Sequence, residues 1–174
     1  MTESGGDGGR EGDLIEVVFR DLFVVAYRVA YRILGDVADA EDAAAEAIAR
    51  AVVHWPSVGR MPYRSAWVAR VASNVAIDRV RKKQRSSPDA VFLGEDLSEA
   101  AVLRLALAQA LSALPTRQRE VVALRYLADL PEAEVATTLG VSRNTVKKHT
   151  ARAIAAMRET LGHSWKDLDL VPDR

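Results

Sequence analysis

Residues 131–148 read PEAEVATTLGVSRNTVKK, a stretch whose residues suit two short helices joined by a tight turn. Val135 and Leu139 recur at helical spacing on the first of them. Gly140 can adopt the left-handed conformation that ends a helix. Ser142 is a good N-cap for the second helix, and Val146 lies four positions later, where that helix must return to the core. The pattern predicts a helix-turn-helix.

The exposed start of the second helix is basic and polar, which suits contact with DNA. Arginine, lysine and asparagine side chains reach base edges in the major groove and phosphates, and a helix N-terminus itself favours phosphate. The predicted contacts are Ser142, Arg143, Asn144, Lys147, Lys148 and Arg152. Arg152, one turn further along, is equally compatible with ordinary surface. The alternative for the whole motif is a helical hairpin with a solvated basic face.

The 174-residue chain has a formal net charge of zero, but its charges are segregated. Residues 36–46 carry five acids and no base, whereas residues 60–85 carry eight bases and the single acid Asp78. Residues 86–101 are acidic again, and residues 142–158 hold five bases and no acid. Blocks of alternating sign predict several faces with different partners.

Composition argues against several classes of protein. The absence of cysteine excludes disulfides, thiolate metal sites and cysteine nucleophiles. His54, His149 and His163 are scattered, and neither a glycine-rich phosphate loop nor a nucleophile paired with a base occurs. We therefore expect no enzyme, cofactor, metal or small-molecule substrate. No long apolar run or export leader is present, which predicts no membrane segment and a cytoplasmic location.

Hydrophobic periodicity predicts an all-α chain of two small helical bundles. The expected helices cover 13–34, 37–53, 63–83, 99–114, 116–127, 131–139 and 142–161, with a loop at 55–62. The expected organisation is a disordered tail at 1–12, a first domain at 13–85, a linker at 86–98, a second domain at 99–162 and a C-terminal tail at 163–174.

The predicted helix at 63–83 also carries a basic surface. By the 3.6-residue period, Arg70, Asn74 and Arg81 fall near one face, opposite the apolar stripe. Together with Trp55, Arg60 and Tyr63 of the preceding loop, this face suits a groove for single-stranded or melted DNA. Taken alone, the basic run is more typical of a solvated helix end.

Three segments in this order resemble an extracytoplasmic-function (ECF, group 4) sigma factor of bacterial RNA polymerase, a member of the sigma-70 family. They are YRILGDVADAEDAAAEAIARA, YRSAWVARVASNVAIDRVRKK and LSALPTRQREVVALRYLADLPEAEVATTLGVSRNTVKK, within about residues 14–162. The resemblance implies two helical domains, regions 2 and 4, joined by a flexible linker that passes through the RNA exit path of the polymerase.

The resemblance also implies partners and roles. Core RNA polymerase would be bound through its β′ clamp helices and β flap, promoter DNA at two elements, and an anti-sigma factor as a regulator. The residues that match the polymerase-docking motif are Asp36, Asp39, Glu41 and Asp42. In the family, one segment of region 2 melts and reads the minus-10 element. The residues that match this segment are Arg60, Tyr63, Arg64, Arg70, Asn74 and Arg81. The basic residues from 142 onward would read the minus-35 element. The sequence departs from the common family pattern at Ala45, Ile48, Pro131 and residues 148–150.

Two other functions stay open from the residues. The output domain of response regulators also has a helix-turn-helix with a similar recognition helix, but a receiver domain would need alternating strands and helices, which residues 13–85 do not predict. A pure protein-binding adaptor with two helical bundles is the other alternative.

Overall fold

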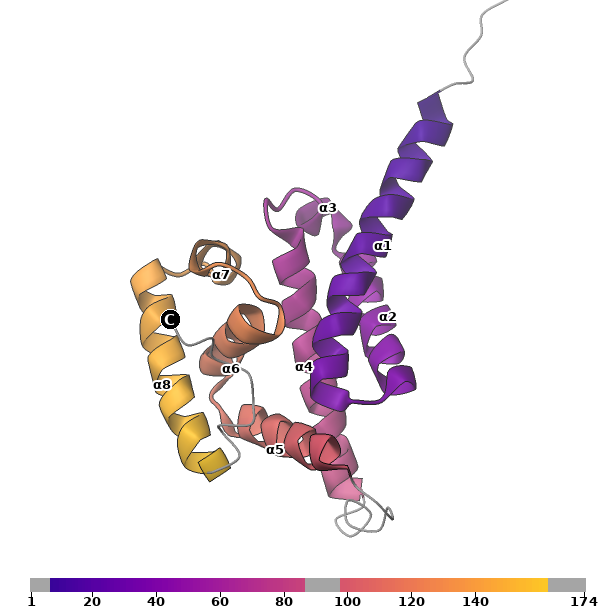
Figure 1. Cartoon of the computed structure of the whole chain (residues 1–174). Helices are drawn as coiled ribbons and strands as arrows, with labels where there is room; N and C mark the ends of the chain where they lie inside the picture. The colour runs from indigo at the N-terminus through magenta and orange to yellow at the C-terminus, as the bar shows by residue number, and fades with distance from the viewer. Residues whose placement is uncertain (1–6, 87–97, 163–174) are drawn as a thin grey trace, which may run out of the picture.

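The computed structural model describes residues 7–86 and 98–162, and the regular structure within these ranges is entirely helical (Figure 1). The predicted all-α class is confirmed. The predicted C-terminal tail at 163–174 and nearly all of the predicted linker at 86–98 lie outside the described residues, as do residues 1–6. No helix in the described ranges has the length and apolarity needed to cross a membrane.

The first bundle contains four helices, α1 (Asp7–Leu34), α2 (Val37–Val53), α3 (Trp55–Val58) and α4 (Arg64–Ser86). One stripe of α1 is buried, with Leu22, Val29 and Ile33 at helical spacing. In α2 the buried face consists only of alanines, Ala40, Ala43, Ala44, Ala47 and Ala51. Because these side chains are methyl groups, α1 and α4 can approach α2 closely.

A tight corner separates α1 from α2. Gly35 has a φ of 70°, a left-handed conformation that glycine adopts without a steric penalty. Asp36 then caps α2, because its Oδ1 accepts a hydrogen bond from the amide of Asp39 at 2.8 Å. The break predicted at these two residues is therefore built by one backbone conformation and one side-chain cap.

Two predictions for the first bundle were wrong. Residues 7–12 belong to α1 rather than to a disordered tail. Extending a helix that is already nucleated requires only propagation, so weak local propensity did not prevent it. The predicted loop at 55–62 contains the short helix α3, whose first turn holds Pro56. Proline is tolerated there because the first turn of a helix needs no donor from its nitrogen.

The second bundle contains α5 (Glu99–Ala113), α6 (Thr116–Val122), the π-helical turn η1 (Ala123–Leu127), α7 (Glu132–Leu139) and α8 (Arg143–Leu161). Ser98 caps α5 by accepting from the amide of Ala101 at 3.3 Å. The helix predicted at 116–127 is present, but its last five residues form the wider π turn.

The helix-turn-helix is confirmed within one residue at each predicted start. Gly140 ends α7 with a φ of 64°, in the left-handed region. Val135, Leu139 and Val146 are buried on the facing sides of α7 and α8. The corner glycine and these apolar contacts fix the orientation of α8.

The two bundles pack directly against each other. Helix α4 contacts α5, α6, η1 and α7 of the second bundle, and α1 also contacts α5 and η1, whereas α2 lies on the far side of the first bundle (Figure 1). The buried apolar residues of both bundles form one continuous cluster. The described part of the chain is therefore a closed arrangement of two predicted domains.

Candidate nucleic-acid interface

The start of α8 is held in place by a cap and a buried anchor. The Oγ of Ser142 accepts a hydrogen bond from the amide of Thr145 at 3.1 Å. The side chain of Val146 is fully buried against the rest of the bundle. Ser142 therefore has a structural role, whether or not its hydroxyl also contacts a ligand.

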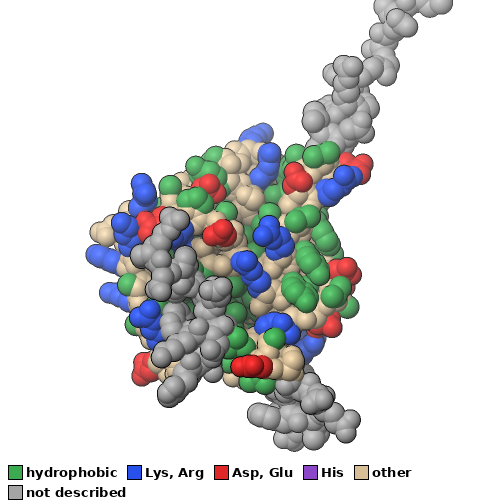
Figure 2. All heavy atoms as spheres, in the orientation of Figure 1, with side chains coloured by type: hydrophobic (Ala, Val, Ile, Leu, Met, Phe, Trp, Pro, Cys, Tyr) green, Lys and Arg blue, Asp and Glu red, His purple; other side chains and the backbone are tan. Residues whose placement is uncertain are grey.

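Four of the predicted contacts lie together on the exposed face of α8. Arg143, Asn144, Lys147 and Lys148 are all exposed, and at 100° per residue they fall within one side of the helix. Arg152 is exposed at the edge of this face. We call Arg143, Asn144, Lys147 and Lys148 the α8 polar face. Figure 2 shows lysine and arginine side chains gathered over α8.

Among the described residues, the α8 polar face has one ion pair with an acid. The Nζ of Lys147 lies 4.0 Å from Oε2 of Glu132 in α7, at the limit of an ion pair. Because the lysine side chain is 65% exposed, this pair is weak and screened by salt. The cationic group remains available for a phosphate or a base edge.

The six residues predicted near the minus-10 element do not share one surface. Arg60 is exposed in the segment between α3 and α4, whereas Tyr63 and Arg64 are half-buried beside it. Arg64 Nη1 donates to the carbonyl oxygen of Gly59 at 3.5 Å. This group therefore forms a small cationic corner at the N-terminal end of α4.

The other three residues follow one stripe of α4, as predicted, and the last of them contacts the second bundle. Arg70 and Asn74 are half-buried, and Arg81 donates a hydrogen bond to the carbonyl oxygen of Ser112 in α5. Asp78, on the same stripe, interacts electrostatically with Arg119 of α6. Arg81 is thus engaged in the contact between the bundles.

Arg119 is an unusual member of this contact because only 8% of it is exposed. Burial lowers the pKa of Arg119, the nearby Arg81 lowers it further, and Asp78 and Glu120 act in the opposite direction. Arg119 Nη2 donates to Thr116 Oγ1 at 3.3 Å, whereas its Nε has no hydrogen-bond partner among the described residues. The interface therefore holds an incompletely satisfied cation.

The predicted polymerase-docking acids are partly engaged inside the first bundle. Asp39 forms ion pairs with Lys83 and, at 4.0 Å, with Arg79, both in α4. Asp42 Oδ2 lies 3.4 Å from Arg79 Nη1. Glu41 is exposed and forms no ion pair with any described residue. With Asp36 acting as a cap, Glu41 and Asp42 are the acids most open to a partner.

Sequence reasoning missed the role of Arg79. It lies 3.8 Å from Glu46 as well, so one guanidinium serves three carboxylates of α2. The signal available in the sequence was the opposite charge of two adjacent helices, which does not reveal the register between them. Within the described ranges, no three His, Asp or Glu side chains are grouped as metal ligands.

Comparison with known proteins adds to this geometry. Residues 18–86 match the family model for sigma-70 region 2, and residues 104–157 match that for sigma-70, region 4. The chain is 33% identical over 174 residues to the ECF RNA polymerase sigma factor SigW of Bacillus subtilis, covering 90% of this chain and 91% of the relative. The chain belongs to the ECF sigma factors. The predicted resemblance is confirmed.

Other relatives of this sigma factor agree. It is 32% identical over 178 residues to the ECF RNA polymerase sigma factor SigL of Mycobacterium tuberculosis, covering 92% of this chain and 96% of the relative. Its fold is similar to that of the sigma factor RpoE from Bartonella quintana, solved in complex with the anti-sigma factor NepR. The TM-score is 0.55 at 19% identity, over 86% of this chain and 97% of that one. The match to region 2 removes the response-regulator alternative.

Proposed function

We propose that this sigma factor directs transcription from promoters that it recognises at two places, with α8 on the minus-35 element and the first bundle on the minus-10 element. The first bundle is region 2 and the second is region 4. The single observation that carries the proposal is the α8 polar face, where four DNA-competent side chains are exposed together at the start of a capped and anchored helix.

Region 4 is proposed to place the start of α8 in the major groove. Arginine can donate to guanine and asparagine can pair with adenine, while lysines neutralise phosphates. Arg143 and Asn144 are proposed as the base-reading residues because they lie nearest the helix N-terminus, which docks first. Lys147, Lys148 and Arg152 are proposed to bind phosphates.

Region 2 is proposed to capture bases of the non-template strand after the duplex opens. Arg60, Tyr63 and Arg64 at the corner before α4 supply cations and one aromatic ring, a combination suited to single strands. Arg70 and Asn74, on the separate stripe further along α4, are proposed as additional contacts with the strand. Arg81 would join it only after leaving the carbonyl oxygen of Ser112.

Core polymerase is proposed to bind region 2 through the acidic side of α2 and region 4 through the β flap. Glu41 and Asp42 are proposed as the direct contacts with the β′ clamp helices because their side chains are exposed. Asp36 and Asp39 are proposed to position that surface through the cap and the pairs with α4. An anti-sigma protein is proposed as a regulator, since the RpoE neighbour was solved with one.

The proposed mechanism needs no covalent chemistry by the chain, which acts as a binding factor in the cytoplasm. The polymerase holds regions 2 and 4 at a fixed separation. Two weak DNA contacts then act together through effective concentration and select a promoter that neither would select alone.

Run-off transcription with core polymerase over a library of promoter sequences tests this proposal. The expected result is initiation from templates that share two conserved blocks at a fixed spacing. A gel shift with polymerase and the selected promoter should give a band that depends on this protein. Absence of promoter-dependent transcripts together with retained polymerase binding would favour the adaptor alternative.

A further inference from the structure

One face of α1 is both apolar and exposed. Val17, Val24 and Tyr31 recur every seven residues, which places them on one side of the helix. They are 49%, 48% and 38% exposed, whereas Val29 and Ile33 on the opposite side are 1% and 2% exposed. We call Val17, Val24 and Tyr31 the α1 stripe, and Figure 2 shows hydrophobic side chains gathered over α1. The described part of the chain covers only the opposite face of this helix.

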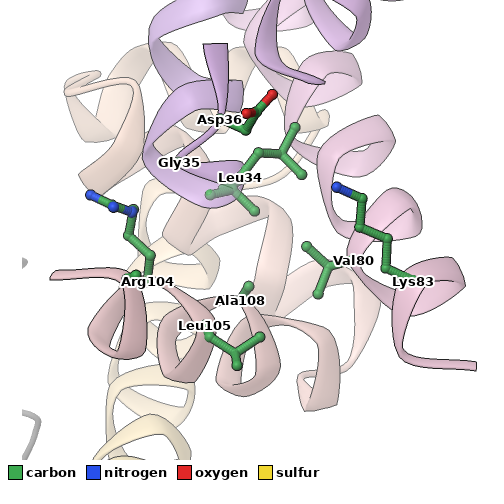
Figure 3. A pocket seen from close by; sticks show the side chains of 10 residues that line it. Leu34, Gly35, Asp36, Val80, Lys83, Arg104, Leu105 and Ala108 are labelled. Atoms are coloured by element: carbon green, nitrogen blue, oxygen red, sulfur yellow. The ribbon is translucent and has the colours of Figure 1, made fainter. Parts of the chain in front are cut away.

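The α1 stripe ends in a supported aromatic ring. Tyr31 stacks on the half-buried Tyr27, with ring centroids 5.8 Å apart and planes inclined by 17°. This contact restrains the exposed ring, so covering it with another molecule costs less side-chain entropy. Three residues later, Leu34 lines a groove of about 250 Å³ that α1 shares with α4 and α5 (Figure 3). The stripe therefore runs from Val17 to Tyr31, about 21 Å along the helix.

Two opposite charges lie along one edge of the α1 stripe. Asp21 and Arg28 are exposed and seven positions apart, so they share that edge at about 10 Å from each other along the helix. This separation is too large for an ion pair, and neither side chain forms a hydrogen bond or ion pair with any described residue. On the other edge, Arg20 is paired with Glu16 at 2.9 Å. The edge with Asp21 and Arg28 therefore offers one charge of each sign to a partner.

This pattern of charges is complementary to itself. When two copies of α1 pack antiparallel about a two-fold axis, each edge of the stripe faces the same edge of the other copy. With the axis midway between residues 21 and 28, Asp21 of each copy lies opposite Arg28 of the other. That midpoint falls beside Val24, the centre of the stripe, so the ion pairs and the apolar contacts require the same register. A parallel pair would instead bring Asp21 near Glu16 of the other copy, which is a contact of like charges.

We propose that the free sigma factor forms an antiparallel homodimer through the α1 stripe, with two Asp21–Arg28 ion pairs along its edge. A two-fold contact uses the same patch on both copies, and contiguous exposed apolar surface is typical of interaction sites. A contact made by one helix over about 21 Å is smaller than a standard interface, so the dimer is weak and depends on protein concentration. No residue of the stripe belongs to the proposed promoter or polymerase contacts, so the inference does not rest on them.

Charge reversal tests both the occupant of the stripe and its register. Asp21→Arg leaves only cations at positions 21 and 28, and Arg28→Asp leaves only carboxylates. In sedimentation equilibrium, each variant alone should dimerise about tenfold more weakly than the unsubstituted protein, because two attractive pairs become repulsive. An equimolar mixture of the two variants should recover the association as a heterodimer. Glu159→Arg, at an exposed position of α8, is the matched control and should leave the association unchanged.

Disulfide crosslinking tests the direction of packing. The chain has no cysteine, so a single introduced thiol reports on its own position. In the antiparallel pair, position 24 lies beside its own copy, whereas position 17 lies about 22 Å along the helix from its copy, beyond the reach of a disulfide. Val24→Cys should therefore crosslink under mild oxidation on a non-reducing gel. Val17→Cys should not, nor should Val102→Cys, which places the thiol at an exposed position of α5.

Three results would overturn the proposal, with circular dichroism showing folded protein in each case. The first is an unsubstituted protein that sediments as a monomer up to its highest soluble concentration. If Val24→Glu then also abolishes binding to core polymerase, the stripe is a polymerase surface instead. The second is a mixture of Asp21→Arg and Arg28→Asp proteins that associates no better than either variant alone. The third is equal crosslinking of Val17→Cys and Val24→Cys, which would indicate parallel packing.

Discussion

Arg79 of α4 lies 3.4 Å from Asp42 of α2 and is also within 4.0 Å of Asp39 and 3.8 Å of Glu46. The pairing joins α2 and α4 of region 2 on the side where polymerase contact is proposed. Arg79 therefore helps to fix the positions of three carboxylates on the surface of α2.

Replacing Arg79 should destabilise region 2. Arg79→Ala leaves three carboxylates near one another without their shared cation, and we expect a loss of about 1 kcal/mol in unfolding free energy, since the pairs are partly exposed. Urea denaturation measures it, and the difference should shrink in high salt. Arg20→Ala is the control, because its pair with Glu16 is an exposed one within α1. Equal losses in both variants would show that Arg79 has no special role.

The α8 polar face should be needed for minus-35 use but not for polymerase binding. Arg143→Ala combined with Lys147→Ala removes one base-reading group and one phosphate contact. Initiation at a minus-35-dependent promoter should fall about 10- to 100-fold. Run-off transcription measures this loss, and co-elution with core polymerase measures the retained contact. Normal initiation by the doubly substituted protein would refute the assignment.

Ser142 allows the cap to be separated from DNA binding. Ser142→Ala should lower the unfolding free energy by about 1 kcal/mol because the amide of Thr145 loses its acceptor. Ser142→Asp restores an acceptor, so its stability should be close to that of the unsubstituted protein. Its negative charge should still weaken DNA binding by region 4. A protein with Asp at this position that binds the minus-35 duplex normally would place Ser142 away from the DNA.

Gly140 should be required for its backbone conformation and not for space. A Cβ there would meet no atom within 4 Å, but the φ of 64° is unfavourable for residues with side chains. Gly140→Ala should therefore cost about 1 kcal/mol, and Gly140→Asn should cost less, because asparagine tolerates this conformation. Thermal unfolding of both variants compares them, and equal destabilisation by Ala and Asn would point to a packing effect.

The features predicted well from sequence are those that local chemistry determines. Gly140, Ser142 and Val146 lie close together in the sequence, so their spacing alone was sufficient to predict the helix-turn-helix. The stripe of Arg70, Asn74 and Arg81 followed from helical periodicity. Periodicity could not predict the partner of Arg81, because its contact with Ser112 joins residues 31 positions apart.

The remaining differences have the same origin. Nη1 of Arg32 in the last turn of α1 donates to the carbonyl oxygens of Tyr126 and Leu127, which are 94 and 95 positions away, and the π turn that presents them has no distinctive local signal. Residues 7–12 were assigned to a tail because their glycines disfavour isolated helix, whereas in the protein they continue a helix whose later turns are buried. Long-range contacts decide each of these cases.

The alanine face of α2 has a mechanical consequence. A helix that meets its neighbours through methyl groups cannot shift by exchanging side-chain rotamers, because a methyl group has none to exchange. Region 2 is therefore expected to behave as a rigid body, so that its acidic and basic surfaces keep a constant spacing when polymerase and DNA bind.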